Sequence, residues 1–359
     1  MCVNFHPKSF LADFQPVVGL WARDLSRIKK KLDIFGEVYH LQWNHSSAMQ
    51  QTTHIPIFLD EVIGSFRLTA GRTFLDGTLG GCGHAAAILQ AFPMARLWAM
   101  DVDPAAIERG KNLLPADRAT IIHGNFSNLD QLDRKNFDGI LLDIGVSSDQ
   151  LDTPERGFSF RSDGPLDMRM DPSQGISASQ FLKTATREEL IHAIRDFGEE
   201  PCWRRVVDAI VDARKTPHTL ERTTSFANLM CRVLPSNYRS KVSPVTRTFQ
   251  GIRIAINGEL SALEYALPKA FAALNPCGVI AILTFHSLED RIVKQHFRNW
   301  AGMSIDRHDG RSQQDRFSHG RILTPKPIVP SRHELNLNPR SRSAKLRLFQ
   351  KKVEDVDRK

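Results

Sequence analysis

Short apolar runs alternate with helical patterns between residues 54 and 145, and this alternation constrains the fold more than any other feature. The runs expected to be strands cover residues 73–76, 97–101, 120–123 and 139–143. Helix-like stretches separate them, for example residues 84–92 and 104–114. Strand–helix alternation at this spacing is typical of βαβ units, whose strands lie parallel in one sheet. The first part of the chain is therefore predicted to be an α/β domain.

The strand pattern stops near residue 150 and returns only at residues 279–285 and 344–349. Between them, from about 150 to 245, apolar residues recur at spacings of three and four, which predicts amphipathic helices that pack on one another. A later helix contains Pro268, which we expect to kink or break it. Turn-forming and charged residues predict a long mobile loop over residues 302–333. The simplest architecture is one α/β domain interrupted by a helical insert.

The domain boundaries follow from these changes of pattern. Regular patterning begins only after Met49, so the preceding residues are expected to be a poorly ordered extension or an over-called gene start. The five predicted segments are an N-terminal extension (1–50), the first part of the α/β domain (51–150), the helical insert (151–245), the second part of the α/β domain (246–350) and a charged tail (351–359).

Charge is concentrated in the last third of the chain. The 359 residues carry a formal net charge of +8. The segment from Arg291 to Arg347 alone holds thirteen Lys or Arg residues against four Asp or Glu, a net of +9. A basic block of this kind suits a polyanionic partner, because each neutralised phosphate releases counterions. The alternative from charge alone is a solvated basic surface.

The cysteines and the hydropathy pattern narrow the class of protein further. There are five cysteines, and no pair has the C-x-x-C spacing. This pattern favours neither a disulfide framework nor a metal site, and it fits a cytoplasmic protein in a reducing compartment. No apolar run approaches the ~20 residues that a membrane-spanning helix needs.

A glycine-rich loop carries the strongest chemical signal. The sequence Asp-Gly-Thr-Leu-Gly-Gly-Cys-Gly-His occupies residues 76–84, after a predicted strand and before a predicted helix. Glycines such as Gly80 let the backbone turn sharply and approach a ligand closely. Loops in this context bind nucleotide-like cofactors. The spacing does not meet the dinucleotide fingerprint, which counts against a nicotinamide cofactor.

Each of the three later strands ends in a residue suited to such a cofactor. Asp101 ends the second strand, and its carboxylate can accept hydrogen bonds from both hydroxyls of a ribose. Asp103 stands before a proline and is more simply a helix N-cap. Phe126 follows the third strand and is either a partner for an adenine ring or a core residue. Asp143 ends the fourth strand. Ligands of open α/β sheets sit beyond these strand ends.

Several longer motifs resemble one family, the ribosomal RNA small subunit methyltransferase H family. The matching segments occur in the order typical of that family and span residues 54 to about 350. They are His-Ile-Pro at 54–56, Asp-Ile-Gly-Val-Ser-Ser at 143–148, Gln-Leu-Asp at 150–152, Glu-Arg-Gly-Phe-Ser-Phe at 155–160, Gly-Pro-Leu-Asp-Met-Arg-Met at 164–170, Gly-Glu-Glu at 198–200, Thr-Arg-Thr-Phe-Gln at 246–250, Phe-His-Ser-Leu-Glu-Asp-Arg at 285–291 and Asn-Pro-Arg-Ser-Arg-Ser-Ala at 338–344.

The resemblance implies a class I (Rossmann-like) S-adenosylmethionine methyltransferase sheet with an inserted all-helical domain for RNA recognition. It implies methylation of N4 of a specific cytosine in the decoding centre of 16S-type RNA. The usual family residue at position 82 is glycine, so the Cys82 side chain must point away from the ligand or narrow the pocket. By resemblance, the positions that contact the cofactor are Cys82, Gly83, His84, Asp101, Phe126, Asp143 and Gln150.

Catalysis requires acceptors near the cytosine amine, because its nitrogen becomes positive as it attacks. Asp143 is the first candidate by its position at a strand end. Ser147 and Ser148 are weaker candidates, since they can equally satisfy a turn. A proton role for His286 is a further hypothesis, with a structural histidine as the more common outcome. Ser287 and Asp290 are expected to form a capping box at the start of a helix.

Two groups of basic residues are candidates for contacts with RNA phosphates. Arg156, Arg161 and Arg169 follow the fourth strand, where pairing with Asp163 or Asp167 is an equally simple explanation. The second group, which can also be plain surface charge, is Arg340, Arg342 and Lys345, with Arg347 beside them.

The expected partner is small-subunit ribosomal RNA or an assembled 30S-type subunit, with no membrane; the sequence does not indicate an oligomeric state. One rival function is that of a nicotinamide oxidoreductase. The other is a non-catalytic RNA-binding protein that retains the methyltransferase fold. The intact glycine loop, Asp101 and Asp143 favour the enzyme.

Overall fold

The computed structural model describes residues 56–353 except residues 70, 217, 234–242 and 313. The expected N-terminal extension, His54 and Ile55 of the first family motif, and residues 354–359 of the charged tail lie outside the described residues. Among the helices that are described, none is long and apolar enough to cross a membrane.

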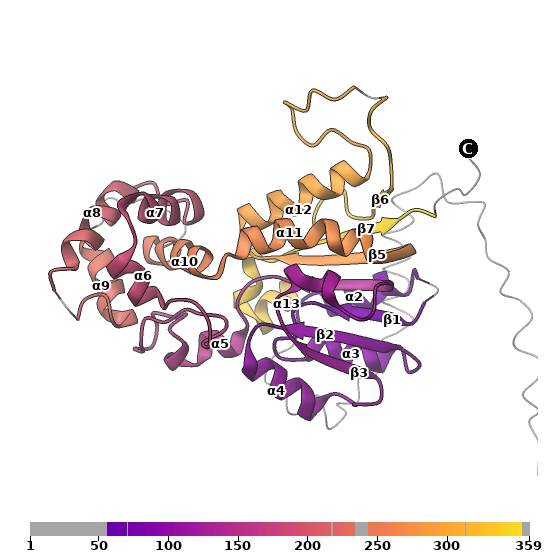
Figure 1. Cartoon of the computed structure of the whole chain (residues 1–359), viewed down its shortest axis with the longest axis horizontal. Helices are drawn as coiled ribbons and strands as arrows, with labels where there is room; N and C mark the ends of the chain where they lie inside the picture. Colours follow the sequence, from indigo (N-terminus) through magenta and orange to yellow (C-terminus); the bar gives the residue numbers. More distant parts are fainter. Residues whose placement is uncertain (1–55, 70, 217, 234–242, 313, 354–359) are drawn as a thin grey trace, which may run out of the picture. The chain divides into compact units, whose positions relative to one another are not determined.

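A mixed sheet organises the α/β part of the chain (Figure 1). Its order is β3-β2-β1-β4-β5-β7-β6, with β1 to β5 parallel and β7 antiparallel to both β5 and β6. This is the class I, Rossmann-like sheet that the resemblance implies, so the predicted fold class is confirmed. The strands are β1 (Thr73–Asp76), β2 (Arg96–Asp101), β3 (Ala119–His123), β4 (Phe137–Asp143), β5 (Leu274–Thr284), β6 (Gly320–Ile322) and β7 (Lys345–Lys351).

The strand order reverses between β1 and β4, and this reversal positions a ligand site. Two crossovers leave the sheet in opposite directions there, so the carboxyl ends of β1 and β4 border a crevice. Asp76 and Asp143 end these two strands, and Asp101 ends β2 beside them. The topology therefore gathers the predicted strand-end residues at one edge of the sheet.

Both faces of the sheet are covered, because successive strand residues point to opposite sides. In β5, Val279 and Ala281 pack in one apolar core beneath helices α2 and α3, whereas Ile280 and Ile282 pack in a second core with α11 and α12. The helices of this part are α2 (Leu59–Phe66), α3 (Gly83–Ala91), α4 (Pro104–Leu113), α5 (Ser148–Asp152), α11 (Glu259–Ala272), α12 (Ser287–Trp300) and α13 (Arg332–Leu337), with 3₁₀ turns η2 (Phe126–Gln131), η3 (Pro154–Arg156) and η5 (Pro339–Ser343).

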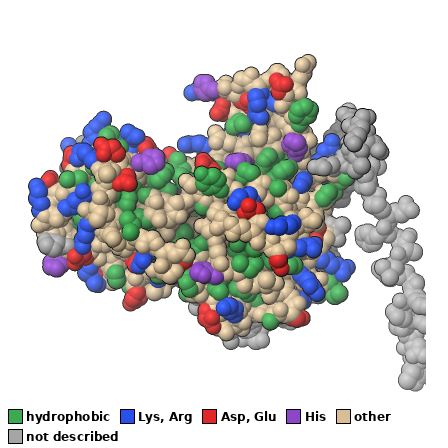
Figure 2. All heavy atoms as spheres, viewed as in Figure 1, with side chains coloured by type: hydrophobic (Ala, Val, Ile, Leu, Met, Phe, Trp, Pro, Cys, Tyr) green, Lys and Arg blue, Asp and Glu red, His purple; other side chains and the backbone are tan. Residues whose placement is uncertain are grey.

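The described residues of the insert form helices joined by loops, with one isolated bridge between Pro165 and Arg222, and they have a third apolar core. Val245 and Phe249 of α10 belong to this core, together with residues of the preceding helices. Figure 2 shows Lys and Arg side chains at the outer edge of this helical group. Three arginines in its helices, Arg187, Arg204 and Arg205, are exposed. The helices are α6 (Ala178–Thr184), α7 (Arg187–Ile191), the π-helical turn η4 (His192–Phe197), α8 (Trp203–Ala213), α9 (Thr223–Val233) and α10 (Pro244–Asn257).

Two local expectations are corrected by the structure. Helix α11 runs through Pro268, so the predicted break there is wrong, while a kink at this residue stays a prediction. The break lies before it, at Gly258, whose φ of 61° ends α10. The expected long loop at 302–333 contains the short strand β6, which pairs with β7.

Candidate functional site

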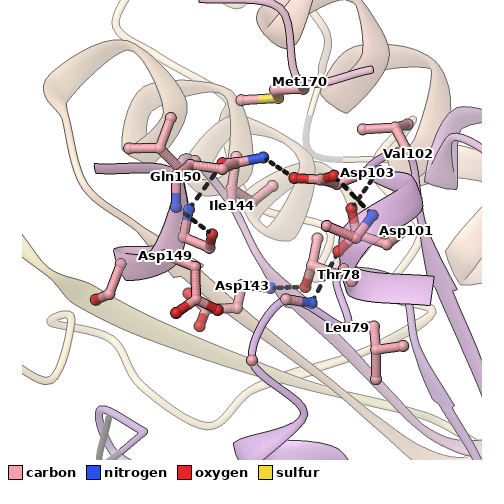
Figure 3. Close-up of a pocket in the computed structure, with 18 of the residues that line it drawn as sticks. Thr78, Leu79, Asp101, Val102, Asp103, Asp143, Ile144, Asp149, Gln150 and Met170 are labelled. Carbon is pink, nitrogen blue, oxygen red and sulfur yellow. Dashed lines mark hydrogen bonds between the residues drawn. The ribbon is translucent and has the colours of Figure 1, made fainter. Parts of the chain in front are cut away.

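A cavity of about 370 Å³ lies at the carboxyl ends of the parallel strands (Figure 3). Small-molecule sites in proteins typically measure about 300–1,000 Å³. The glycine loop forms one wall, and residues that follow β2, β3 and β4 form the others. Candidate residues in the lining are Gly80, Gly83, His84, Asp101, Phe126, Asp143, Ser147, Ser148, Gln150 and Arg156.

The glycine loop approaches the cavity with its backbone. Gly80 has a φ of 47°, a conformation that favours glycine, and its amide donates a 2.8 Å hydrogen bond to Asp101 Oδ2. A side chain at Gly77 would lie only 2.5 Å from Leu142 Cδ2, so the loop can pack on β4 only without one. These two positions explain why the turn between β1 and α3 requires glycine.

Cys82 lies beside the cavity but does not line it. Its side chain is fully buried in the apolar core under α3, and burial raises the pKa of its thiol to about 12. Its backbone has a φ of 67° at the N-cap of α3. The thiol therefore points away from the ligand, as one of the two sequence alternatives required.

Replacing Cys82 by glycine is expected to leave cofactor affinity within about twofold, because the thiol does not reach the cavity. The free energy of unfolding should change by no more than about 1 kcal/mol. Glycine relieves the strain of the left-handed backbone, but it loses the packing of the thiol and makes the unfolded chain more flexible. Calorimetric titration with S-adenosylmethionine and denaturant unfolding check this; a tenfold gain in affinity would show that the thiol narrows the site.

Asp101 is held with its carboxylate in the cavity. Its Oδ2 accepts from the Gly80 amide and its Oδ1 accepts from the Asp103 amide, each at 2.8 Å. Burial raises the pKa of this carboxyl, and the backbone donors oppose that rise. Each carboxylate oxygen has a further lone pair that can accept a hydrogen bond from a ligand hydroxyl.

A network behind the cavity joins Asp103, Gln150 and Arg156. Asp103 caps α4 by accepting from the Ala105 amide at 3.0 Å, as its position before a proline predicts. Its Oδ2 also accepts from Gln150 Nε2 at 2.9 Å and from Arg156 at 2.6 Å. The Arg156 guanidinium further donates to the backbone carbonyls of Arg169 and Met170. Arg156 therefore anchors the backbone of residues 169–170, and Met170 lines the cavity.

Both serines after β4 line the cavity, and one of them also caps a helix. Ser147 is the N-cap of α5: its hydroxyl accepts from the Gln150 amide, and Gln150 Oε1 accepts from the Ser147 amide at 3.0 Å. Ser147 therefore satisfies a turn, which is one of the two roles that the sequence allows for it. Ser148 begins α5 and lines the cavity. Phe126 is half-buried, since it lines the cavity and also packs against the second core.

Asp143 and His84 face each other at the centre of the site. The Asp143 amide donates to the Thr78 hydroxyl at 2.6 Å, and Asp143 Oδ2 lies 3.6 Å from His84 Nδ1. Asp143 Oδ1 is buried and has no hydrogen-bond partner among the described residues. Burial, and then the negative charge of Glu289, raise the pKa of Asp143 to about 7. This carboxyl is therefore poised to change its protonation near neutral pH.

Most other basic candidates lie outside this cavity and are paired. Arg169 forms a two-pronged ion pair with Asp167, one of the pairings the sequence allowed. Arg340 pairs with Asp152, and Lys345 with Asp290. Among the described residues, no ion pair forms at the exposed side chains of Arg161 and Arg342.

His286 is structural in this arrangement. It is the N-cap of α12, and its capping box closes with Glu289, whose carboxylate accepts from the His286 amide at 3.3 Å. The predicted box of Ser287 and Asp290 is therefore wrong by one residue. Asp290 instead pairs with Lys345 and Arg347 of β7.

Three further residues, which the sequence analysis did not single out, complete the site. Thr78 anchors the backbone of β4, as described above. Arg109 of α4 donates to the Gly80 carbonyl at 2.9 Å and pairs with Asp149 at 2.8 Å. Asn257, the last residue of α10, accepts from the Met170 amide at 2.8 Å and lines the cavity. Only Thr78 had a local signal, because it lies within the glycine loop.

Comparison with known proteins places the chain in a family. Residues 51–352 match the profile of the MraW methylase family. The chain is 44% identical over 319 residues to "Ribosomal RNA small subunit methyltransferase H" of Granulibacter bethesdensis, covering 85% of this chain and 94% of that protein. It is 42% identical over 311 residues to the protein of the same name from Heliobacterium mobile, covering 83% and 98% of the two chains. By its sequence and by the extent of these matches, the chain belongs to the MraW methylase family.

Proposed function

We propose that this protein transfers a methyl group from S-adenosylmethionine to N4 of a specific cytosine in the decoding centre of small-subunit ribosomal RNA. The family and the names of the relatives support an enzyme that acts on this RNA. The observation that carries the proposal is the cavity at the strand-order reversal, which presents the carboxylates of Asp101 and Asp143 together. A non-catalytic RNA-binding protein would have no use for that pair.

The residues that line the cavity suit S-adenosylmethionine. Asp101 would accept from the ribose hydroxyls, and the Phe126 ring would lie against the adenine. The glycine loop at Gly80 and Gly83, with the adjoining backbone of Cys82 and His84, would follow the methionine part, and Gln150 would support the wall. When bound, this cofactor supplies an electrophilic methyl group on a sulfonium, so the protein mainly has to orient the nucleophile.

Asp143 is the proposed catalytic acceptor. Its side chain is 28% exposed and lines the cavity, so the carboxylate can accept a hydrogen bond from the cytosine amine there. Such an acceptor stabilises the positive charge that develops on the nitrogen. Ser148 remains a weaker candidate for contact with the amine, and Ser147 supports the site through its cap on α5.

The helical insert is the proposed RNA-recognition domain. We propose the boundaries that the sequence predicts, with α10 added to the insert because it packs in the same apolar core. The proposed phosphate contacts are Arg204 and Arg205 of the insert, with Arg161 and Arg342, all of which are exposed and form no ion pair among the described residues. Arg169, Arg340 and Lys345 reach RNA only if their ion pairs open, because their charges are already satisfied. A cytoplasmic location stays a prediction from the cysteine pattern.

The form of the substrate is tested by labelled methyl transfer to three substrates in parallel. Free small-subunit RNA, precursor particles and assembled 30S-type subunits, all lacking the modification, are compared at equal RNA concentration. We propose the assembled particle as the preferred substrate, since the decoding centre takes its shape there. Faster transfer to free RNA would contradict this choice.

Replacing Asp101 by alanine is expected to weaken S-adenosylmethionine binding by about tenfold to a hundredfold. Each hydrogen bond to a charged group contributes about 1.5–3 kcal/mol, which sets this range. Calorimetric titration measures it, with NAD as the control ligand. Binding of NAD by the unaltered protein would favour the nicotinamide rival, and binding of neither ligand would favour the RNA-binding module.

A further inference from the structure

One pair of buried groups in the site has a use beyond binding the cofactor. His84 and Asp143 come from different elements, α3 and the end of β4, yet His84 Nδ1 lies 3.6 Å from Asp143 Oδ2. The His84 side chain is only 7% exposed, so its ring exchanges protons with solvent poorly. Both residues border the cavity, but the Asp143 side chain is 28% exposed, four times as much as that of His84. A proton can therefore reach His84 Nδ1 most directly through Asp143.

The tautomer of His84 is set by a neighbouring carbonyl. Its Nε2 lies 3.0 Å from the backbone oxygen of Ile57, and a carbonyl oxygen can only accept a hydrogen bond. Nε2 therefore carries the proton of the neutral ring, and Nδ1 presents a lone pair. Nδ1 and the ionised Oδ2 of Asp143 are then two acceptors that face each other with no hydrogen between them. At 3.6 Å the two atoms lie just beyond hydrogen-bond distance, and a proton added to either atom would draw them together into a hydrogen bond.

The charges around the pair suit the temporary storage of that proton. Burial lowers the pKa of His84 and raises that of Asp143, so neither group holds a charge easily on its own. The negative charge of Asp76, at the end of β1, acts to raise the pKa of His84 and so opposes the effect of burial. Asp76 Oδ2 is itself buried without a hydrogen-bond partner in the described part of the chain. The negative charge of Glu289, on α12, raises the pKa of Asp143 further. A proton shared by the pair satisfies both groups, which then titrate as a unit.

We propose that His84 and Asp143 together take up the proton that the cytosine amine releases, with Asp143 receiving it and His84 Nδ1 sharing it. This inference rests on the proposed function for the identity of the amine. His84 is a positioning residue in this scheme, because it acts on the reacting nitrogen only through Asp143.

The bonds and the charges balance in this step. The amine nitrogen forms a bond to the methyl carbon, the carbon–sulfur bond breaks, and its electron pair stays on sulfur. The nitrogen becomes positive and loses one N–H proton to Asp143, while the electrons of that N–H bond stay on nitrogen. The proton rests between Oδ2 and Nδ1 and leaves to water through Asp143 when the cavity opens to solvent. No oxidant or reductant is needed.

Nuclear magnetic resonance of the full chain labelled with ¹⁵N-histidine tests the pair without RNA or cofactor. At alkaline pH, His84 should show a protonated Nε2 and an unprotonated Nδ1. As pH falls through neutrality, the Nδ1 shift should move as the pair takes up one proton. In Asp143→Asn this movement should vanish or its midpoint should shift by at least about one pH unit. An identical titration in both proteins, or the opposite tautomer, would overturn the proposal.

Two variants separate proton sharing from a purely structural role. Glutamine at position 84 can still donate to the Ile57 carbonyl, and asparagine can place an acceptor near the position of Nδ1, but neither can take up a proton. We expect kcat to fall at least about tenfold in both, with the acidic limb of its pH profile displaced and KM for S-adenosylmethionine within about threefold. A His84→Gln enzyme with the native pH profile and kcat would overturn the proposal.

The resonance titration and the variants at position 84 can each fail without the proposed function failing, and the reverse also holds. If methyl transfer to cytosine is not found but the resonance titration behaves as expected, the pair stands and the acceptor is wrong. If methylated cytidine forms but the titration is unchanged in Asp143→Asn, the function stands and the shared proton is rejected.

Discussion

Replacement of Asp143 by asparagine is expected to lower kcat for methyl transfer by about 10²- to 10⁴-fold, the range for loss of an acid–base group. Asparagine keeps the shape of the side chain, and the backbone amide keeps its bond to the Thr78 hydroxyl. The variant still presents an oxygen, but it loses the negative charge and cannot take up a proton. The KM for S-adenosylmethionine should therefore change much less than kcat.

The native enzyme should gain activity as pH rises through neutrality. The folded-state pKa of Asp143 is raised to about 7, chiefly by burial and further by the charge of Glu289. The carboxylate is the active form, so kcat should climb through about pH 7 and level off above it. Glu289→Gln removes the like charge and should move the climb to lower pH. A kcat profile that is flat across neutral pH would contradict the role of Asp143.

The same shift has a consequence for stability with a definite sign. The pKa of Asp143 is higher in the folded state than its value near 3.8 in the unfolded state, so its contribution to stability is greatest below that lower pKa. There the carboxyl is protonated in both states, and folding buries no charge. This advantage is lost as pH rises from there to about 7, because the unfolded state then ionises freely. Asp143→Asn should therefore reduce the loss of stability between acidic and neutral pH.

The second large effect is expected from Arg156→Ala, which should destabilise the fold by about 3 kcal/mol. Truncating one member of a buried ion pair leaves the other charge without compensation. The Arg156 and Asp103 side chains are 17% and 8% exposed. The loop anchored through the carbonyls of Arg169 and Met170 should also loosen, so cofactor affinity should fall. Denaturant unfolding and calorimetric titration measure both losses.

Arg161→Ala is the matched control from the same loop. Its side chain is exposed and has no ion pair among the described residues, so stability should stay within about 0.5 kcal/mol. RNA affinity should fall, and the slope of log affinity against log salt should decrease by about one. The anchoring role of Arg156 is contradicted if Arg156→Ala folds normally and loses only RNA affinity.

The strand-end residues could be predicted because their positions depend on local patterns. Asp101 and Asp143 each follow a buried apolar run, and parallel strands bring such ends to one edge. The glycine loop was recognisable for the same reason. Cys82 shows the limit of this reasoning, since the sequence left two directions for its side chain and only packing against the core decides between them.

The long-range ion pairs could not be predicted, because their partners are distant in the sequence, unlike the pair of Arg169 with Asp167. Arg156 pairs with Asp103, 53 residues earlier, rather than with the nearby Asp163 or Asp167. Arg340 pairs with Asp152, 188 residues earlier. Strand β6 was missed because three residues in a charged segment give no alternating pattern, and only pairing with β7 defines it.

Identification of the methylated nucleoside tests the central claim most directly. Small ribosomal subunits that lack the modification are incubated with the protein and labelled S-adenosylmethionine, and the RNA is digested and analysed by nucleoside mass spectrometry, with Asp143→Ala as the control. We expect N4-methylated cytidine with the native protein and its loss with Asp143→Ala. Cofactor binding without methylated cytidine, or label on another nucleoside, would contradict it.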